Sequence, residues 1–403
     1  MLYALLVFTA LPYVTFLASP MPASYLQPFA LVCAFIICLI NSKKIIKLAK
    51  LDDFAILILI FFGLIFILFI KIFNAYLNND YSALFEFNFG YLSPISFLII
   101  YHAYKSALNQ SDLKNIAIIF KWMTLLYFFV GLAQIIINPN FLTFLVGGNK
   151  TGLFGEAGGR GTISLASEPS YYAFQMIAIA TILALCESRF FAILAILQIF
   201  FIAISSTGIS ILIISIILLL FINKKYQSIS LIVLSVLCFI LYISKDSLLN
   251  GTRLSLLLDV FLNFDFSYFI FTDESTSERF VHAAMPYFFS LKNLLLPNEF
   301  FHETWVHYLE SFNIPWFYNL EPNSRIMSGF GEILVLYGFF IIPFIIKFTK
   351  TLLVNLKSDD FFLAYLILCT FLIMFATYSF STPTVALIFV LCENKNQNKI
   401  PKL

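Results

Sequence analysis

Residues 54–73 read FAILILIFFGLIFILFIKIF, a run of 20 residues in which Lys71 is the only charged side chain. A helix needs roughly 20 apolar residues to cross the hydrocarbon core of a bilayer, so this run predicts a membrane-spanning helix. Similar runs recur along the 403-residue chain, which is 61% hydrophobic and 11% charged. A water-soluble domain is nearer half apolar and about a quarter charged. The composition therefore excludes a soluble globular fold, a disordered chain and a disulfide-stapled secreted module. We predict a single all-α, polytopic integral membrane domain over residues 1–403.

Apolar runs bounded by polar clusters predict about twelve transmembrane helices. The first run lacks a basic leading segment and is followed directly by another, so we expect a retained span rather than a cleaved signal peptide. The six cysteines lie within apolar stretches and form no Cys-x-x-Cys motif, so we expect them to act as small apolar fillers. The twelve runs cover residues 1–18, 25–41, 54–73, 91–108, 115–137, 171–186, 190–206, 208–223, 228–244, 329–348, 361–380 and 383–393.

The basic residues orient these spans, because Lys and Arg accumulate in cytoplasmic loops. With both termini in the cytoplasm, 16 of the 24 basic residues fall at cytoplasmic helix ends, whereas 15 of the 22 acidic residues fall outside. Two exterior segments are long, residues 138–170 and 245–328, and long structured loops usually carry function. The eight exterior basic residues are Lys71, Lys150, Arg160, Lys245, Arg253, Arg279, Lys292 and Arg325.

The first exterior loop holds a glycine-rich run, GLFGEAGGRG at 152–161, followed by SEPS at 167–170. Pro is favoured at the first helical position, and Ser or Glu suits the cap. A helix is therefore predicted to begin at Glu168-Pro169, with its partially positive end facing the loop. Arg160 on this backbone would make a site for an anion such as phosphate. A flexible loop before an ordinary capped helix explains the same residues.

The second exterior loop has 84 residues and is too apolar for a disordered linker. The spacing of its apolar residues predicts helices at 253–270 and 277–296, lying on the membrane surface or over a cavity. On the second helix, Arg279 and His282 lie three apart on one face, and Glu278 and His282 lie four apart. A solvated charged face is the alternative interpretation.

The sequence excludes two common motifs, a phosphate-binding loop and a zinc protease motif. The string GGNKT at 147–151 lacks the Gly that precedes Lys in a phosphate-binding loop. His302 and His307 are five residues apart, whereas the zinc protease motif needs histidines four apart on one helix face.

Four motifs follow one another along the chain: Arg160 followed by SEPS at 167–170, SSTG at 205–208, SERF at 277–280 and SGFGEILVLYG at 328–338. Their order resembles the bacterial O-antigen and capsular polysaccharide polymerase family (Wzy-type) and the related O-antigen ligases. In the ligases an Arg-His pair is usually adjacent, so the separation of Arg279 from His282 slightly favours a polymerase.

This resemblance implies a glycosyltransferase of the bacterial inner membrane, with both long loops and the active site in the periplasm. It would transfer a growing glycan from undecaprenyl diphosphate to the non-reducing end of the next lipid-linked repeat unit, without a metal or other cofactor. The implied partners are an undecaprenyl-diphosphate-linked oligosaccharide, membrane lipid and a chain-length regulator, and no nucleic acid. An O-antigen ligase acting on lipid A core and a lipid-linked sugar flippase or transporter are the alternatives.

The chemistry of such a transfer selects candidate residues. A departing lipid diphosphate concentrates negative charge, which Arg neutralises by gripping two phosphate oxygens. A carboxylate or imidazole must take the proton of the acceptor hydroxyl; Glu168 and His282 are the candidates, although a carboxylate held ionised beside Arg is a weak base. Aromatic rings such as Tyr171, Tyr172, Trp305 and Trp316 would stack on sugars or anchor the chain at the membrane interface. The candidate diphosphate ligands are Arg160, Arg253, Arg279 and Arg325.

Overall fold

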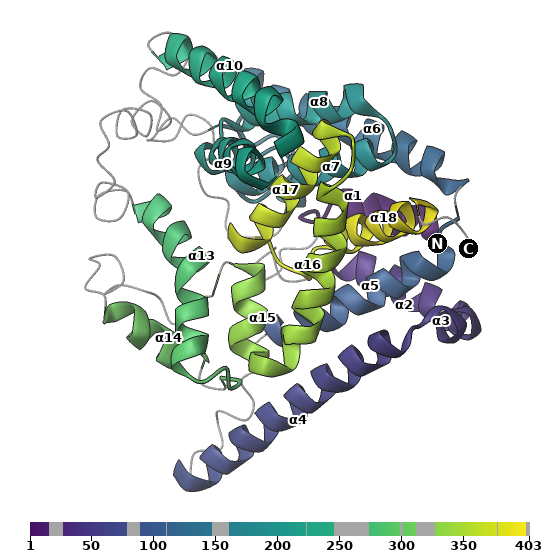
Figure 1. Cartoon of the computed structure of the whole chain (residues 1–403), viewed down its shortest axis with the longest axis vertical. Coiled ribbons are helices and arrows are strands. Elements are labelled where there is room, and N and C mark those ends of the chain that lie inside the picture. Colours follow the sequence, from purple (N-terminus) through teal and green to yellow (C-terminus); the bar gives the residue numbers. More distant parts are fainter. Residues whose placement is uncertain are drawn as a thin grey trace.

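The computed structural model of the chain describes residues 1–15, 27–78, 89–109, 111–146, 161–222, 224–245, 274–298, 301–311, 326, 328–376 and 378–399. Every regular element in these ranges is a helix, and an isolated antiparallel bridge joins Val14 to Val146 (Figure 1). The all-α prediction is therefore confirmed for the described residues.

Helices occupy each of the twelve predicted runs. They are α1 (Leu2–Ala10), α2 (Pro28–Ile40), α4 (Leu51–Asn78), α5 (Ser93–Ala107), α6 (Asp112–Ile136), α7 (Pro169–Leu185), α8 (Arg189–Gln198) with a π-helical turn η4 (Ile199–Ala203), α9 (Ser206–Ile222), α10 (Gln227–Lys245), α15 (Gly329–Tyr337) continued by η7 (Gly338–Ile341) and α16 (Ile342–Leu356), α17 (Phe361–Ala376) and α18 (Pro383–Lys399).

Helices outside these runs include the two in the second exterior loop. The predicted helix at 277–296 is found as α13 (Glu274–Lys292), and the residues of the rejected zinc motif form α14 (Phe301–Glu310). The predicted helix at 253–270 lies outside the described residues. The remaining elements are α3 (Ser42–Leu48), η2 (Phe89–Leu92), η3 (Thr143–Leu145) and η5 (Lys224–Tyr226).

Among the described helices, fewer than twelve qualify as candidate membrane spans. Within the described residues, Leu51–Leu77, Asp112–Ile136 and Gly329–Leu356 are long and apolar enough to cross a membrane. Two bent pairs raise the number to five if each is one span: α2 with α3, at 85°, and Ser206–Ile222 with Lys224–Val236, at 120°. Other apolar helices are short; α7 has 17 residues, about 25 Å at 1.5 Å per residue, against a hydrocarbon core of about 30 Å. Three to five spans are thus supported, and the twelve-span arrangement stays a prediction.

α7 is the central helix, and all of its residues are buried. It contacts α6, α8, α9, α17 and α18. Its Gln175 Nε2 donates to the Ala10 carbonyl at 3.1 Å, and the Tyr378 hydroxyl donates to Gln175 Oε1 at 2.6 Å. Hydrogen bonds between helices in an apolar interior are worth about 0.6 to 2 kcal/mol each. α7 is thus held from several sides, and a residue at its first turn stands on a rigid support.

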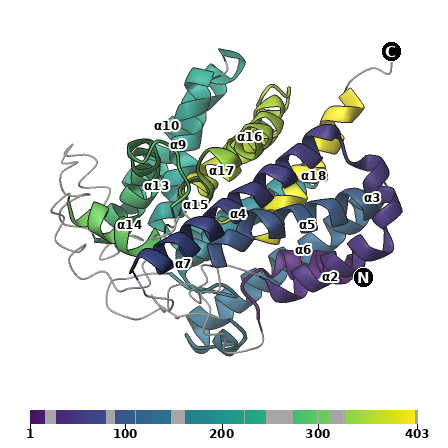
Figure 2. The ribbon, with the colours of Figure 1, turned by 90° about the horizontal axis from the view of Figure 1, so that it is seen from below.

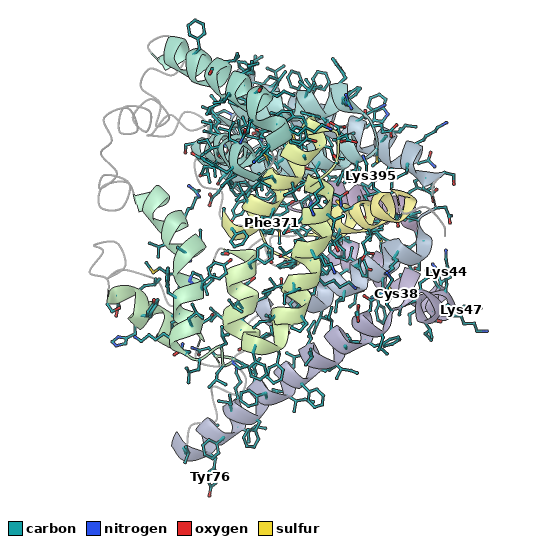
Figure 3. All side chains as sticks on the ribbon, viewed as in Figure 1. Cys38, Lys44, Lys47, Tyr76, Phe371 and Lys395 are labelled. Atoms are coloured by element: carbon teal, nitrogen blue, oxygen red, sulfur yellow. The ribbon has the colours of Figure 1, made fainter. Side chains whose placement is uncertain are left out.

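α4, in contrast to the buried α7, directs most of its large apolar side chains outward. Phe61, Phe62 and Phe69 are each more than half exposed, at 55%, 56% and 64%. α4 runs along the lower edge of the molecule in Figure 1 and crosses the front of the view in Figure 2, and Tyr76 marks its far end in Figure 3. A continuous apolar face of this size is unfavourable in water and compatible with hydrocarbon.

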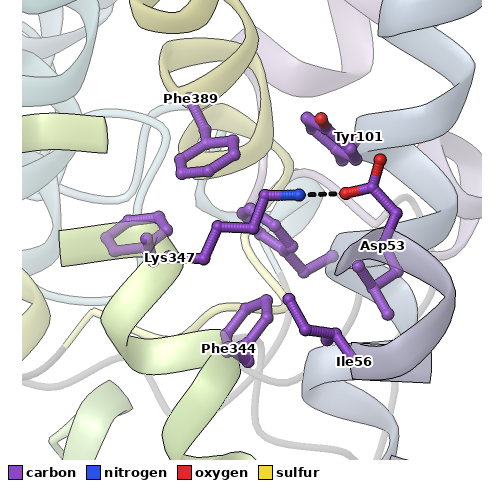
Figure 4. Close-up of a pocket in the computed structure, with 9 residues that line it drawn as sticks. Asp53, Ile56, Tyr101, Phe344, Lys347 and Phe389 are labelled. Carbon is purple, nitrogen blue, oxygen red and sulfur yellow. Dashed lines mark hydrogen bonds and ion pairs between the residues drawn. The ribbon is translucent and has the colours of Figure 1, made fainter. Parts of the chain in front are cut away.

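Charged side chains from α4, α5, α16 and α18 meet in the interior. Asp53 of α4 forms an ion pair with Lys347 of α16 beside the rings of Phe344 and Phe389 (Figure 4). Lys105 Nζ lies 3.6 Å from carboxylate oxygens of both Asp53 and Glu393. The Asp53 side chain is only 3% exposed. This cluster joins four helices through opposite charges.

Asp53→Asn should destabilise the fold, because Lys347, whose side chain is 24% exposed, loses its buried carboxylate partner. Removing one partner of a buried ion pair costs about 3 to 5 kcal/mol, so the melting temperature in detergent should fall by many degrees. Asp359→Asn is the control, since its ion pair with Lys225 is exposed, with side-chain exposures of 93% and 59%, and an exposed pair is worth about 1 kcal/mol or less. Equal decreases in melting temperature for the two variants would show that the interior cluster stabilises the fold no more than an exposed ion pair does.

Candidate functional site

The first turn of α7 presents a carboxylate and a hydroxyl. Glu168 is the N-cap residue, with extended backbone angles (φ −146°, ψ 158°), and Pro169 occupies the first helical position. The Glu168 side chain makes no capping hydrogen bond; instead Ser170 Oγ donates to Glu168 Oε2 at 3.1 Å. The predicted helix start is confirmed, and the Glu168 carboxylate is available to partners other than the α7 backbone.

Arg279 of α13 completes this group from a distant part of the chain. Its Nη2 donates to Ser170 Oγ at 3.1 Å and lies 3.4 Å from Glu168 Oε2. The side chains of Arg279 and Glu168 are 16% and 28% exposed. SEPS at 167–170 and SERF at 277–280, which sequence analysis selected separately, are therefore in direct contact. We call Glu168, Ser170 and Arg279 the α7–α13 site.

The segment leading to Glu168 is fixed against α6. Gln134 Nε2 donates to the Ser164 carbonyl at 2.9 Å, and the Ser164 amide donates back to Gln134 Oε1 at 2.7 Å. Ser164 Oγ donates to the Tyr127 carbonyl at 2.7 Å. Ser164 has a positive φ of 48°, a conformation that costs a non-glycine residue energy unless its surroundings hold it. These three hydrogen bonds hold Ser164 in this conformation, four residues before Glu168.

The same segment packs closely on the π-helical turn η4. The Thr162 amide donates to the Ile202 carbonyl at 3.0 Å. A Cβ at Gly161 would lie 2.0 Å from the carbonyl oxygen of Ala203, so only glycine fits at this position. The chain leaves η4 through Ile204, whose φ is 41°, and π-helical turns are frequent near functional sites. Ser205 then caps α9 by accepting a hydrogen bond from the Gly208 amide at 3.1 Å.

α13 is held in place by α15. A Cβ at Gly331 would lie 2.7 Å from Pro286 Cβ, so glycine permits the close approach of the two helices. Just after α13, the Leu295 carbonyl accepts from the Phe339 amide at 2.8 Å, and the Asn298 amide donates to the Val335 carbonyl at 3.1 Å. The position of Arg279 therefore depends on the glycine-containing helix at 328–338.

His282, the second candidate base, is buried at 1% exposure one turn beyond Arg279. Its ring centroid lies 5.8 Å from that of Trp305 of α14. Trp305 is itself fully buried and packs edge-on against Phe289 at 5.7 Å. The structure thus places His282 and Trp305 in the contact between α13 and α14, rather than in the hydrogen-bonded group of Glu168, Ser170 and Arg279.

The two candidate sugar-stacking tyrosines are buried in the helix core. Tyr172 is 0% exposed, and its hydroxyl donates to Gln198 Oε1 at 2.6 Å. Tyr171 is 8% exposed, with its ring centroid 5.6 Å from that of Tyr13. Neither ring presents a free face to a ligand in this structure, because α7 is covered on all sides. The sequence selected these two tyrosines but did not reveal that α7 buries both of them.

Three of the four candidate diphosphate ligands, Arg160, Arg253 and Arg325, lie outside the described residues, as does Trp316. Arg279 is the candidate arginine that the structure places. Gln134 was not selected from the sequence, although an amide within the apolar run 115–137 indicates a buried group that needs hydrogen-bond partners.

In the part of the chain that the structure describes, no group of three or more His, Cys, Asp or Glu side chains is arranged to hold a metal ion. Comparison with known proteins finds no family model, no curated protein and no solved structure that matches this chain.

Proposed function

We propose that the chain is a polysaccharide polymerase that transfers a glycan from undecaprenyl diphosphate to the non-reducing end of a lipid-linked repeat unit. The observation that carries this proposal is the contact of Arg279 with Glu168 and Ser170, which lie 111 and 109 residues away along the chain. A guanidinium group beside a carboxylate at the start of a buried helix combines the two groups that this transfer needs, a counter-charge for the diphosphate and a proton acceptor.

The proposed environment is the inner membrane of a bacterium, with about twelve spans, both termini in the cytoplasm and the α7–α13 site in the periplasm. Apolar helices with outward-facing side chains support a membrane location. The sidedness rests on the distribution of Lys and Arg, which favours the cytoplasm for the opposite ends of the helices. In Figures 1 and 2, α13 lies on the far side of the molecule from α3 and the N-terminus.

In the proposed reaction, the acceptor sugar hydroxyl attacks the anomeric carbon of the donor glycan. A new glycosidic C–O bond forms, the C–O bond to the diphosphate breaks, and undecaprenyl diphosphate leaves with the bonding electron pair. The hydroxyl proton passes to the Glu168 carboxylate. Arg279 stabilises the charge that accumulates on the departing diphosphate.

Exchange of partners by Arg279 would link the two halves of this reaction. Without substrate, Arg279 forms an ion pair with Glu168. A diphosphate carries more negative charge than a carboxylate and accepts two guanidinium hydrogen bonds, so it competes for Arg279. Once Arg279 turns to the diphosphate, the Glu168 oxygen that it contacted is left to accept the hydrogen bond of the acceptor hydroxyl. The donor would thereby prepare its own proton acceptor.

Glu168→Gln is expected to abolish chain extension, because an amide of the same shape cannot accept the hydroxyl proton. General-base catalysis contributes about 10² to 10⁴-fold in rate, so long glycan chains should disappear from a polysaccharide ladder while the protein accumulates normally. Glu310→Gln on α14 is the control, since Glu310 is a partly exposed carboxylate of the second exterior loop that pairs only with His307 among the described residues. Wild-type chain lengths for Glu168→Gln would exclude Glu168 as the base and make His282→Gln the next variant.

Deletion of the gene tests the proposed reaction in cells and separates it from the two alternatives. A polymerase deletion should leave single repeat units attached to lipid A, because the ligation and flipping steps remain. Complete loss of glycan from lipid A would instead indicate a ligase or a flippase. Complementation with the intact chain should restore the ladder.

A further inference from the structure

We propose that residues 42–50, which comprise α3 and the two residues after it, bind acidic phospholipid headgroups at the membrane surface. We call this segment the α3 surface. The inference is independent of the proposed polymerase reaction, because it concerns the end of the molecule away from the α7–α13 site.

The backbone turns sharply at the start of the α3 surface. α3 is bent by 85° from α2, and α4, a candidate span, begins at Leu51 directly after it. A helix nearly perpendicular to an adjoining apolar helix, and joined to a candidate span, would lie along the membrane surface rather than cross it. Figures 1 and 2 show α3 at the end of α2, beside the start of α4 and at the edge of the molecule.

The α3 surface carries an unusual concentration of positive charge. Its sequence SKKIIKLAK contains Lys43, Lys44, Lys47 and Lys50 and no acidic residue. All four lysines are exposed, and no described carboxylate lies within ion-pair distance of their ammonium groups. Lys43 and Lys47 are four residues apart and Lys44 and Lys47 three apart, so they share one helix face. Figure 3 shows Lys44 and Lys47 at the outer edge of the molecule.

Apolar side chains are exposed beside these charges. Ile46 is 67% exposed and Leu48 is 40% exposed. A basic helix with exposed apolar residues suits the boundary between headgroups and acyl chains, where the apolar side chains insert and lysines extend to the phosphates. A polybasic segment at a membrane surface is attracted to anionic lipid. Charge and exposure together favour an acidic phospholipid as the occupant.

Titration of the delipidated full chain with phosphatidylglycerol, followed by native mass spectrometry, tests this proposal. The triple variant Lys43→Gln/Lys44→Gln/Lys47→Gln should bind phosphatidylglycerol at least about tenfold more weakly, because each lysine near an anionic surface contributes a factor of about five. Binding of phosphatidylcholine should not change. Added NaCl should weaken wild-type binding of phosphatidylglycerol and should hardly affect the variant.

The matched control is Lys114→Gln/Lys350→Gln/Lys357→Gln, which removes the same charge from exposed lysines of α6, α16 and the turn after α16. This control should keep wild-type affinity for phosphatidylglycerol. Equal losses in both triple variants, no loss in the α3 variant, or no preference for phosphatidylglycerol over phosphatidylcholine would overturn the proposal. Displacement of the lipid by millimolar inorganic phosphate would also overturn it, since it would indicate a site for free anions.

A spectroscopic measurement tests the location separately. Ile46→Trp should add fluorescence that is quenched by lipids brominated near the headgroup, relative to the background of the three native tryptophans. Quenching only by lipids brominated at the chain ends, or no added quenching, would contradict a position at the headgroup boundary.

Discussion

Arg279→Ala is expected to reduce chain extension by about 10² to 10³-fold while the protein still inserts and accumulates. Removing one fixed donor that stabilises charge in a transition state costs about 2.7 to 4 kcal/mol, and Arg279 is the described arginine that reaches Glu168 and Ser170. Arg279→Lys should retain part of the activity, because it keeps the charge but loses the two-pronged grip on phosphate oxygens. The length distribution of the polysaccharide ladder measures both effects.

Arg189→Ala is the matched control for this series. Arg189 also forms an ion pair with a carboxylate, that of Asp360 at 2.9 Å, but its side chain is 67% exposed. It begins α8, just after the C-terminal end of α7, so the length of α7, about 25 Å, separates it from Glu168. Arg189→Ala should leave the ladder unchanged. A wild-type ladder from Arg279→Ala, or equal losses from the two variants, would remove Arg279 from the mechanism.

The second large effect is expected for Gly161→Ala. The added Cβ would lie 2.0 Å from the oxygen and 2.3 Å from the carbon of the Ala203 carbonyl, and backbone atoms of a packed π-helical turn cannot move aside cheaply. Overpacking of this kind costs about 1 to 3 kcal/mol, and more where backbone must shift. Because Gly161 precedes Glu168 by seven residues on a segment clamped to α6, we expect both a lower melting temperature and loss of chain extension.

Gly63→Ala is the control for this substitution. At Gly63 the nearest atom to a new Cβ is a ring carbon of Tyr337, at 2.9 Å, and a side chain can give way more easily than backbone. The melting temperature in detergent should fall much less for Gly63→Ala than for Gly161→Ala. An unchanged melting temperature and ladder for Gly161→Ala would show that the 161–168 segment does not position the site.

The parts of the structure that local signals control were predictable from the sequence. Pro169 and its preceding polar residues marked the start of α7, because a helix cap is a local feature. The periodicity after residue 277 marked α13 within a few residues. Glu168 and Arg279 were both selected because a diphosphate transfer requires their chemistry. Their direct contact is a tertiary feature that no single motif contains.

Burial and helix length were less predictable. Tyr172 and Trp305 carry the same side chains as residues that stack on sugars, and only the packing of α7 and α14 shows that both are buried. Twelve spans were predicted, whereas three to five described helices or helix pairs are long and apolar enough to cross a membrane, because apolar composition does not reveal how short α7 and α17 are. The clamp between Gln134 and Ser164 depends on a loop folding back onto α6, which sequence spacing does not encode.

Reconstitution of the purified chain with a single defined undecaprenyl-diphosphate-linked repeat unit tests the proposed reaction most directly. We expect products of two, three and more repeat units that remain attached to undecaprenyl diphosphate, with one undecaprenyl diphosphate released for each unit added, and no such products from Arg279→Ala. If the purified wild-type chain binds this lipid but leaves it at one repeat unit, the chain is not a polymerase.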